Sequence, residues 1–190
     1  MVEPSVSNVV APNPPAVGLP ALPEFPEIFA THFRYCWLSL KRLGVNGGDL
    51  EDLTHEVFLR VHAQLLQHDP ERPLRPWIFN IALGLASNYR RLARHRLQFH
   101  AEPPERIADG PSADERLIAN ERNAMVQRAL EQVPLQHRAV LILHDMDEVA
   151  VPQIATSLGI GTNTAYSRLR LGREAFRRAL EKLQTRGGSK

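Results

Sequence analysis

The sequence has few of the residues that a disulfide-bonded, β-rich or membrane-embedded protein would need. Its 190 residues include one cysteine, Cys36, which excludes a disulfide framework and fits a reducing cytoplasm. Aromatic residues make up only 6% of the chain, and runs of β-branched residues are scarce. The uncharged stretch over residues 4–23 contains six prolines, so we expect neither an export signal nor a membrane helix there. These absences favour an all-α protein that works in the cytoplasm.

The sequence also lacks the residue patterns of an active site. It has no glycine-rich phosphate loop, nucleophile elbow or pair of catalytic carboxylates. His55 and Glu56 begin like a zinc-protease helix, but Leu59 stands where the second histidine would be needed. His32 and Cys36 lie four residues apart, and two ligands do not complete a metal site. We therefore expect no enzyme activity, no catalytic residue, no bound metal and no cofactor.

Charge is distributed unevenly, although the formal net charge is only +2. Four arginines and no acid lie between Tyr89 and Phe99, and seven bases against two acids lie between Gly161 and Arg186. The stretch from Ala101 to Arg122 carries six acids against three bases. Two basic clusters with an acidic spacer suggest two surfaces that contact one polyanion, and solvated helix faces are the alternative.

The pattern of apolar residues predicts two small helical domains joined by a flexible linker. Apolar residues at helical spacing predict helices over residues 28–43, 49–66, 76–92, 117–133, 135–145, 151–158 and 162–183. Asp49 is a suitable N-cap for the second of these helices, and Gly84 inside the third costs about 1 kcal/mol relative to alanine. We expect a disordered tail over residues 1–24, domains over 25–99 and 116–184, a linker over 100–115 and a disordered tail over 185–190.

Residues 153–165 form a helix-turn-helix pattern. Ala155 is small enough for a close helix crossing, and Gly159 can adopt the left-handed conformation of the turn. Apolar residues fill the space between the two helices. The second helix presents amide, hydroxyl and guanidinium groups that can contact base edges and phosphates. We expect DNA contacts from Asn163, Tyr166, Ser167, Arg168, Arg170 and Arg173.

Four segments, in order, resemble the extracytoplasmic-function group of the sigma-70 family of RNA polymerase sigma factors. Residues 49–61 (DLEDLTHEVFLRV) resemble its core-binding region two, and residues 76–91 (PWIFNIALGLASNYRR) are similar to its helix that reads and melts the minus-ten element. Residues 129–140 resemble the opening of region four, and residues 166–173 (YSRLRLGR) resemble its minus-thirty-five reader. The resemblance spans about residues 25–183.

The resemblance implies roles for the matching positions. Region two of the family docks on the polymerase clamp helices, which implies core-polymerase binding by Asp52, His55, Glu56 and Phe58. The resemblance also implies that Asn88, Arg90, Arg91 and Arg94 bind the minus-ten strand. Promoter melting requires a surface that captures unpaired bases beside a row of basic side chains. His55 stands where glutamine is usual, which could alter the partner contact. The resemblance implies core RNA polymerase and promoter DNA as partners. It also implies a cognate anti-sigma factor, because members of the family commonly have one.

A second interpretation stays open at this point. The chain could be a helix-turn-helix transcriptional regulator in which only residues 116–184 touch DNA and the N-terminal half senses a signal or dimerises. Affinity for core polymerase would separate the two functions.

Overall fold

All the secondary structure in the described part of the computed structural model is helical. This part comprises residues 23–99 and 114–187, with side chains placed over 23–93 and 122–185. Seven α-helices account for most of it, and these two ranges contain no strand. The prediction of an all-α fold is confirmed. Residues 1–22, most of the expected linker and residues 188–190 lie outside the described ranges.

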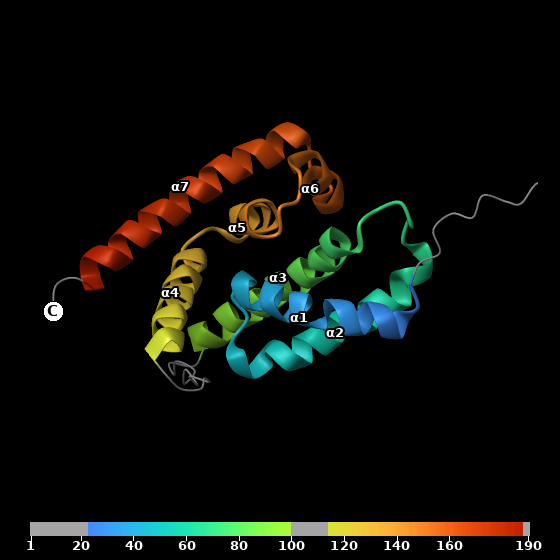
Figure 1. The fold of residues 1–190 in the computed structure, drawn as a ribbon, viewed down its shortest axis with the longest axis horizontal. Helices are drawn as coiled ribbons and strands as arrows, with labels where there is room; N and C mark the ends of the chain where they lie inside the picture. The colour runs from blue at the N-terminus through green and yellow to red at the C-terminus, as the bar shows by residue number, and fades with distance from the viewer. Residues whose placement is uncertain (1–22, 100–113, 188–190) are drawn as a thin grey trace, which may run out of the picture.

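Three helices form the first domain (Figure 1). They are α1 (Phe25–Leu43), α2 (Leu50–Gln64) and α3 (Leu74–Phe99), and each packs against the other two. The apolar stripe of α2 faces this core, with Leu50, Val57 and Val61 at most 1% exposed. Short 3-10 turns over Gly47–Asp49 and Leu65–Gln67 precede and follow α2. The helical spacing of apolar residues is therefore sufficient to explain the three-helix bundle.

The second domain contains α4 (Asp114–Glu131), α5 (Leu135–Leu141), α6 (Val151–Leu158) and α7 (Thr162–Gly187). The long helix α7 packs against the three others, and α5 continues into a π-helical turn over Ile142–Met146. Gly159 ends α6 with φ of 64°, the left-handed conformation that the turn requires. Ala155 is 3% exposed and Ala165 is fully buried, so α6 and α7 form the predicted helix-turn-helix.

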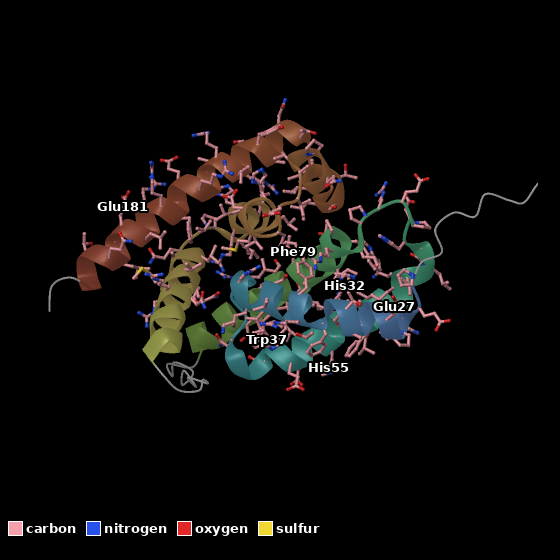
Figure 2. The ribbon with its side chains drawn as sticks, in the orientation of Figure 1. Glu27, His32, Trp37, His55, Phe79 and Glu181 are labelled. Atoms are coloured by element: carbon pink, nitrogen blue, oxygen red, sulfur yellow. The ribbon has the colours of Figure 1, made fainter. Side chains whose placement is uncertain are left out.

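The two domains are packed together rather than separate. Helix α6 packs against α3, and α1 packs against both α4 and α5. Buried side chains of both domains belong to one continuous cluster. Phe79 of α3 is fully buried and lies near the centre of the molecule (Figure 2). Two helical domains are present as predicted. The sequence analysis did not predict that buried apolar residues join them.

Some details of the predicted elements are corrected. Asp49 precedes α2, but its carboxylate makes no capping bond; it accepts a hydrogen bond of 2.7 Å from the Tyr89 hydroxyl. Leu92, the last residue of the helix predicted over residues 76–92 from its apolar spacing, is 55% exposed and not part of the buried face. Helix α4 begins at Asp114, inside the expected linker. Helix α7 continues to Gly187, inside the tail expected over 185–190, where the Thr185 hydroxyl bonds the carbonyl of Glu181.

Candidate nucleic-acid interface

The outward face of α7 carries most of the residues predicted to contact DNA. Asn163, Tyr166, Ser167 and Arg170 are exposed, whereas Arg168 is half-buried beside the inward-facing Leu169. Tyr166 is 55% exposed, which is unusual for a large aromatic side chain without a partner surface. The Arg170 guanidinium lies 3.9 Å from the Glu174 carboxylate, a long and exposed pairing that a phosphate could replace. This face therefore exposes amide, hydroxyl and guanidinium groups of the kind that contact base edges and phosphates.

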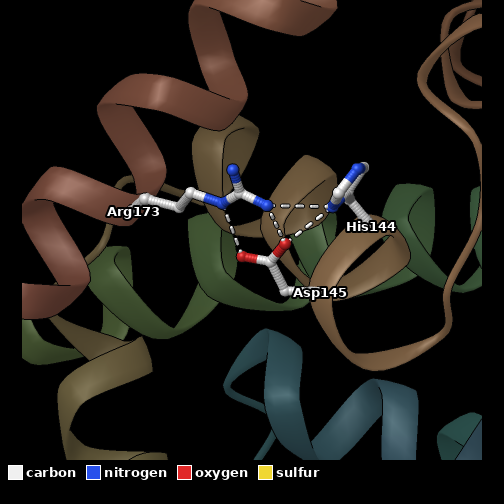
Figure 3. Close-up of polar contacts among 3 residues, drawn as sticks. All are labelled: His144, Asp145 and Arg173. Carbon is white, nitrogen blue, oxygen red and sulfur yellow. Dashed lines mark hydrogen bonds and ion pairs between the residues drawn. The ribbon is translucent and has the colours of Figure 1, made fainter.

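Unlike the other residues of α7 that were predicted to contact DNA, Arg173 forms hydrogen bonds with both carboxylate oxygens of Asp145. Its Nε donates a hydrogen bond of 2.9 Å to Asp145, and its Nη2 bonds the other oxygen of the same carboxylate (Figure 3). His144 Nδ1 lies 2.6 Å from that second oxygen. The hydrogen bond from Arg173 holds the pKa of the Asp145 carboxyl below its ordinary value. The guanidinium thus joins α7 to the π-helical turn, a contact that spacing along α7 could not reveal.

Gly172 fixes the crossing of α7 over α5 and was not identified from the sequence. A Cβ at this position would lie 2.9 Å from the carbonyl oxygen of His137, so no larger residue fits without a backbone shift. The only sequence signal was an isolated glycine within a helical pattern. This close approach fixes how α7 packs on α5.

The predicted minus-ten residues on α3 divide into two environments. Asn88 and Arg91 are exposed on the outer face. Arg90 is half-buried, and its Nη1 donates a hydrogen bond of 3.1 Å to the Leu43 carbonyl at the end of α1. The Arg94 side chain lies outside the described residues. In this arrangement Arg90 is turned toward the contact between the domains.

The face of α2 opposite its buried stripe carries the predicted core-binding residues, with one exception. Asp52, His55 and Glu56 are exposed, and Figure 2 shows His55 on the side of the molecule away from α7. Phe58 is 2% exposed, and its ring lies 4.8 Å from that of Phe29. A buried ring cannot touch a partner directly, so the direct contact predicted for Phe58 is corrected to a role in the core.

Two leucines extend this face and were missed by the sequence analysis. Leu59 is 71% exposed, one to two turns from Asp52, His55 and Glu56, and Leu66 is 99% exposed beyond the end of α2. Single exposed leucines are common, but Leu59 lies three residues from Glu56 on α2, and exposed apolar area bordered by charge is typical of a protein-binding surface. The signal available in the sequence was their position outside the apolar stripe.

The described residues contain no group of three or more side chains suited to hold a metal ion. Cys36 is fully buried, and burial raises the pKa of its thiol to about 12. Trp77 packs against the core with its ring 4.3 Å from that of His68. No helix within the described ranges is long and apolar enough to cross a membrane.

Comparison with known proteins agrees with this geometry. Residues 29–96 match sigma-70 region 2, and residues 123–176 match sigma-70, region 4. The extracytoplasmic-function sigma factor SigL of Mycobacterium tuberculosis is 30% identical over 158 residues, covering 82% of this chain and 88% of SigL. The chain belongs to the extracytoplasmic-function sigma factors.

Two further relatives carry the same family name. SigE of Mycolicibacterium smegmatis is 29% identical over 85% of this chain, which spans 63% of the length of SigE. SigW of Bacillus subtilis is 26% identical, with 77% of this chain and 82% of SigW covered. Because the match extends over region 2, this sigma factor is not a regulator that shares only the helix-turn-helix domain.

Solved sigma factor structures share the fold. The sigma factor RpoE of Bartonella quintana, in complex with the anti-sigma factor NepR, has a TM-score of 0.65 at 18% identity, over 83% of this chain and 96% of RpoE. CnrH in complex with the cytosolic domain of CnrY has a TM-score of 0.59 at 19% identity, with 83% and 88% covered. Both similarities extend over most of this sigma factor, so they include helices of both domains.

Proposed function

We propose that this sigma factor divides its work among three helices. Helix α2 binds core RNA polymerase, α3 captures the minus-ten strand, and α7 reads the minus-thirty-five element as duplex. The observation that carries the proposal is that exposed acidic residues lie on α2, whereas exposed basic residues lie on α3 and α7. The protein then acts as an initiation factor and not as an enzyme.

The acidic face of α2 supports polymerase binding. Asp52, Glu56 and Leu59 lie on one side of the helix at a spacing of three to four residues, and all three are exposed. Exposed apolar area surrounded by charge suits a stable protein–protein contact, because the leucine supplies affinity and the carboxylates supply orientation. Glu56 is paired with Arg60 at 2.8 Å, an exposed contact that a partner could replace.

The basic faces of α3 and α7 support promoter binding. On α7, Asn163 and Arg170 carry groups that pair with base edges in the major groove, and Ser167 can bond phosphate. On α3, Asn88 and Arg91 are exposed where the resemblance places the melted strand. A single strand needs a basic track and exposed contact groups, whereas duplex reading needs a helix that can enter the groove.

The remaining partners and boundaries are part of the same proposal. RpoE and CnrH were each solved with an anti-sigma partner, NepR and CnrY, and we infer a cognate anti-sigma factor for this chain. We place its site of action in the cytoplasm, where core polymerase transcribes the chromosome. We also keep the proposed domain boundaries, which are a tail over 1–24, a domain over 25–99, a linker over 100–115, a domain over 116–184 and a tail over 185–190. The two matched regions lie within the two proposed domains. Helices α4 and α7 extend past the boundaries at 116 and 184.

Charge reversal on α2 tests the polymerase contact. The double variant Asp52→Lys, Glu56→Lys should lower the affinity for core polymerase at least tenfold, because two carboxylates of the docking face become cations. Affinity is measured by fluorescence anisotropy with labelled sigma factor. The control is the double variant Glu71→Lys, Asp69→Lys, since both residues are exposed beyond the end of α2. Both variants should keep the circular dichroism spectrum of the parent.

Equal affinity of the α2 double variant and the parent for core polymerase would show that docking uses another surface. A loss shared by both double variants would show that net charge, and not the face of α2, determines binding. Replacement of Leu59 by Ser separates the apolar from the charged contribution, since it leaves Asp52 and Glu56 unchanged.

A further inference from the structure

Tyr166 lies in the middle of the outward face of α7. This helix buries Ala165 and Leu169 against the core of its own domain. Asn163, Tyr166 and Arg170 are exposed and follow one another at intervals of three and four residues, so they share one face of the helix. A surface that α7 approaches with this face therefore meets the Tyr166 ring between an amide and a guanidinium.

The Tyr166 ring is the one large apolar side chain that the second domain exposes, among the side chains placed over 122–185. It is 55% exposed, and its hydroxyl has no hydrogen-bond partner within the described ranges. Apolar area gains free energy only when it is removed from water, so the exposed part of the ring does not stabilise the free protein. A tyrosine placed in this way suits contact with a partner, because it is large, rigid and amphipathic.

The exposed face around Tyr166 is long enough to cover a few neighbouring base pairs. The helix rises about 10 Å from Asn163 to Arg170, and base pairs of duplex DNA are stacked about 3.4 Å apart. The major groove admits an α-helix, and the N-terminal turns of a reading helix contact the base edges there. Tyr166 lies in the second turn of α7, which places it among the positions that face bases.

Thymine has the base edge that suits this side chain. Asparagine pairs with adenine and arginine pairs with guanine through two hydrogen bonds each, whereas thymine presents an apolar 5-methyl group in the major groove. A methyl group packed against the ring removes apolar area of both groups from water. A hydrogen bond from the hydroxyl to a phosphate would instead leave the ring in water, and it would carry no sequence information.

We propose that Tyr166 is a specificity-determining residue of this sigma factor. Its ring contacts the 5-methyl group of a thymine that lies between the base pairs read by Asn163 and Arg170. The inference rests on the proposed reading of the minus-thirty-five duplex by α7. The methyl contact makes Tyr166 a source of preference among base pairs, and not of affinity for DNA in general.

Selection of DNA by the holoenzyme locates the contact. Holoenzyme assembled from the full chain and its own core polymerase is incubated with promoter-length duplexes of random sequence, and the bound duplexes are sequenced. Tyr166→Ala should remove one thymine preference from the upstream element that the parent selects, whereas Tyr166→Phe should retain it. Gln184→Ala, at an exposed position near the end of α7, should leave every preference unchanged. Survival of all thymine preferences in Tyr166→Ala would overturn the proposal.

Removal of the methyl group from the DNA tests the contact itself. Deoxyuridine in place of the selected thymine should weaken binding of the parent holoenzyme about fourfold, as expected for the burial of one methyl group. The same replacement should weaken binding of Tyr166→Phe to a similar extent and leave the affinity of Tyr166→Ala unchanged. Gel-shift titration measures each affinity. An equal effect in the parent and Tyr166→Ala would contradict the methyl contact, and loss of the preference in Tyr166→Phe would show that the hydroxyl is the contacting group instead.

The same selection separates failure of this inference from failure of the proposed function. If Asn163→Ala and Arg170→Ala leave the selected upstream sequence unchanged, α7 does not read duplex, and both the proposed function of α7 and the role of Tyr166 are wrong. If these two variants alter the sequence and Tyr166→Ala does not, α7 reads duplex and only the role of Tyr166 is wrong. Circular dichroism confirms that each variant is folded.

Discussion

Arg138 has the largest fully buried side chain in the part of the chain that the structure describes. A charged group in this position is stable only because five hydrogen bonds connect it to backbone carbonyls at the ends of α1 and α4 and in the turn after α4. Lysine could not replace it, since one ammonium lacks the planar geometry that serves both helix ends. Arg138 could not be identified from the sequence, because an arginine at this point in an apolar helix gives no signal of where its carbonyl partners lie.

Replacement of Arg138 by Met should lower the free energy of unfolding by about 3 kcal/mol, because carbonyls of Glu131, Val133 and Leu43 lose their donor in a buried site. Urea denaturation followed by circular dichroism measures the change. Arg128→Met on the exposed face of α4 is the matched control and should change the stability by less than about 0.5 kcal/mol. Similar losses in both variants would refute the structural role of Arg138.

Arg170 and Arg173 have the same side chain and different surroundings. Arg170→Ala should weaken binding of the holoenzyme to a minus-thirty-five duplex by about 1–3 kcal/mol if the guanidinium pairs with a guanine. Arg173→Ala should weaken DNA binding less, because both sides of its fork are occupied by Asp145. Gel-shift titration of the two variants decides the order. A larger loss with Arg173→Ala would show that Asp145 releases this guanidinium to DNA.

Residue spacing identifies which positions share a helix face, but it cannot identify the side-chain conformation or the partners that a side chain contacts on other helices. Asn163 and Tyr166 were expected on the outward face of the second motif helix, and both are exposed; Asp52 and Glu56, which were assigned from the family resemblance, are exposed as well. Phe58 is on the buried side of α2, where its ring packs against the rings of Phe29 and Phe33, and these neighbours could not be identified from spacing. Arg90 and Arg173 are long enough to reach partners on other elements, so their contacts depend on tertiary structure.

At the scale of elements, Gly84 and Gly172 both lie within helices, but their surroundings differ, so replacement by alanine should change the stability in opposite directions. Gly84 of α3 is exposed, and a Cβ there would meet nothing within 4 Å. Gly172 of α7 faces the backbone of His137. Helical propensity therefore acts alone at the first position, whereas close packing dominates at the second.

Gly84→Ala should raise the free energy of unfolding by about 1 kcal/mol, because alanine favours the helix and touches nothing. Gly172→Ala should lower it by about 1–3 kcal/mol, since the new methyl group forces α7 away from α5. The urea midpoints of the two variants measure both effects. Changes of the same sign in the two variants would contradict this account of the α5–α7 crossing.

The helices themselves could be predicted because their apolar residues recur at regular intervals. Each expected helix is present, and Gly159 ends α6 as its position in the motif indicated. Helix α4 begins before residue 117 and α7 ends after residue 183, since no proline or glycine marks these two ends, whereas α4 ends at Glu131, two residues before its predicted end. The π-helical turn after α5 has no signal in the spacing, because its geometry depends on the packing of Ile142 and Leu143 in the core.

At the scale of the molecule, local sequence signals could not reveal the docking of the two domains. The Tyr35–Asp147 contact joins residues 112 positions apart, and neither residue belongs to a recognisable motif. The acidic and proline-containing segment between the domains indicated only that they are separate units. Their mutual contact consists of α3 packed against α6 and of α1 packed against α4 and α5, and buried residues of both domains belong to one cluster.

Transcription by core polymerase on duplex and pre-melted promoter templates tests the central claim most directly. The account predicts initiation only when the sigma factor is added. Substitution of Arg90, Arg91 and Arg94 by alanine should impair the duplex template, and a minus-ten bubble should largely rescue it because the bubble removes the unpairing step. Substitution of Arg168 and Arg170 should impair both templates, because duplex reading upstream is still required. Absence of sigma-dependent initiation, or equal rescue of the two mutant sets, would contradict the account.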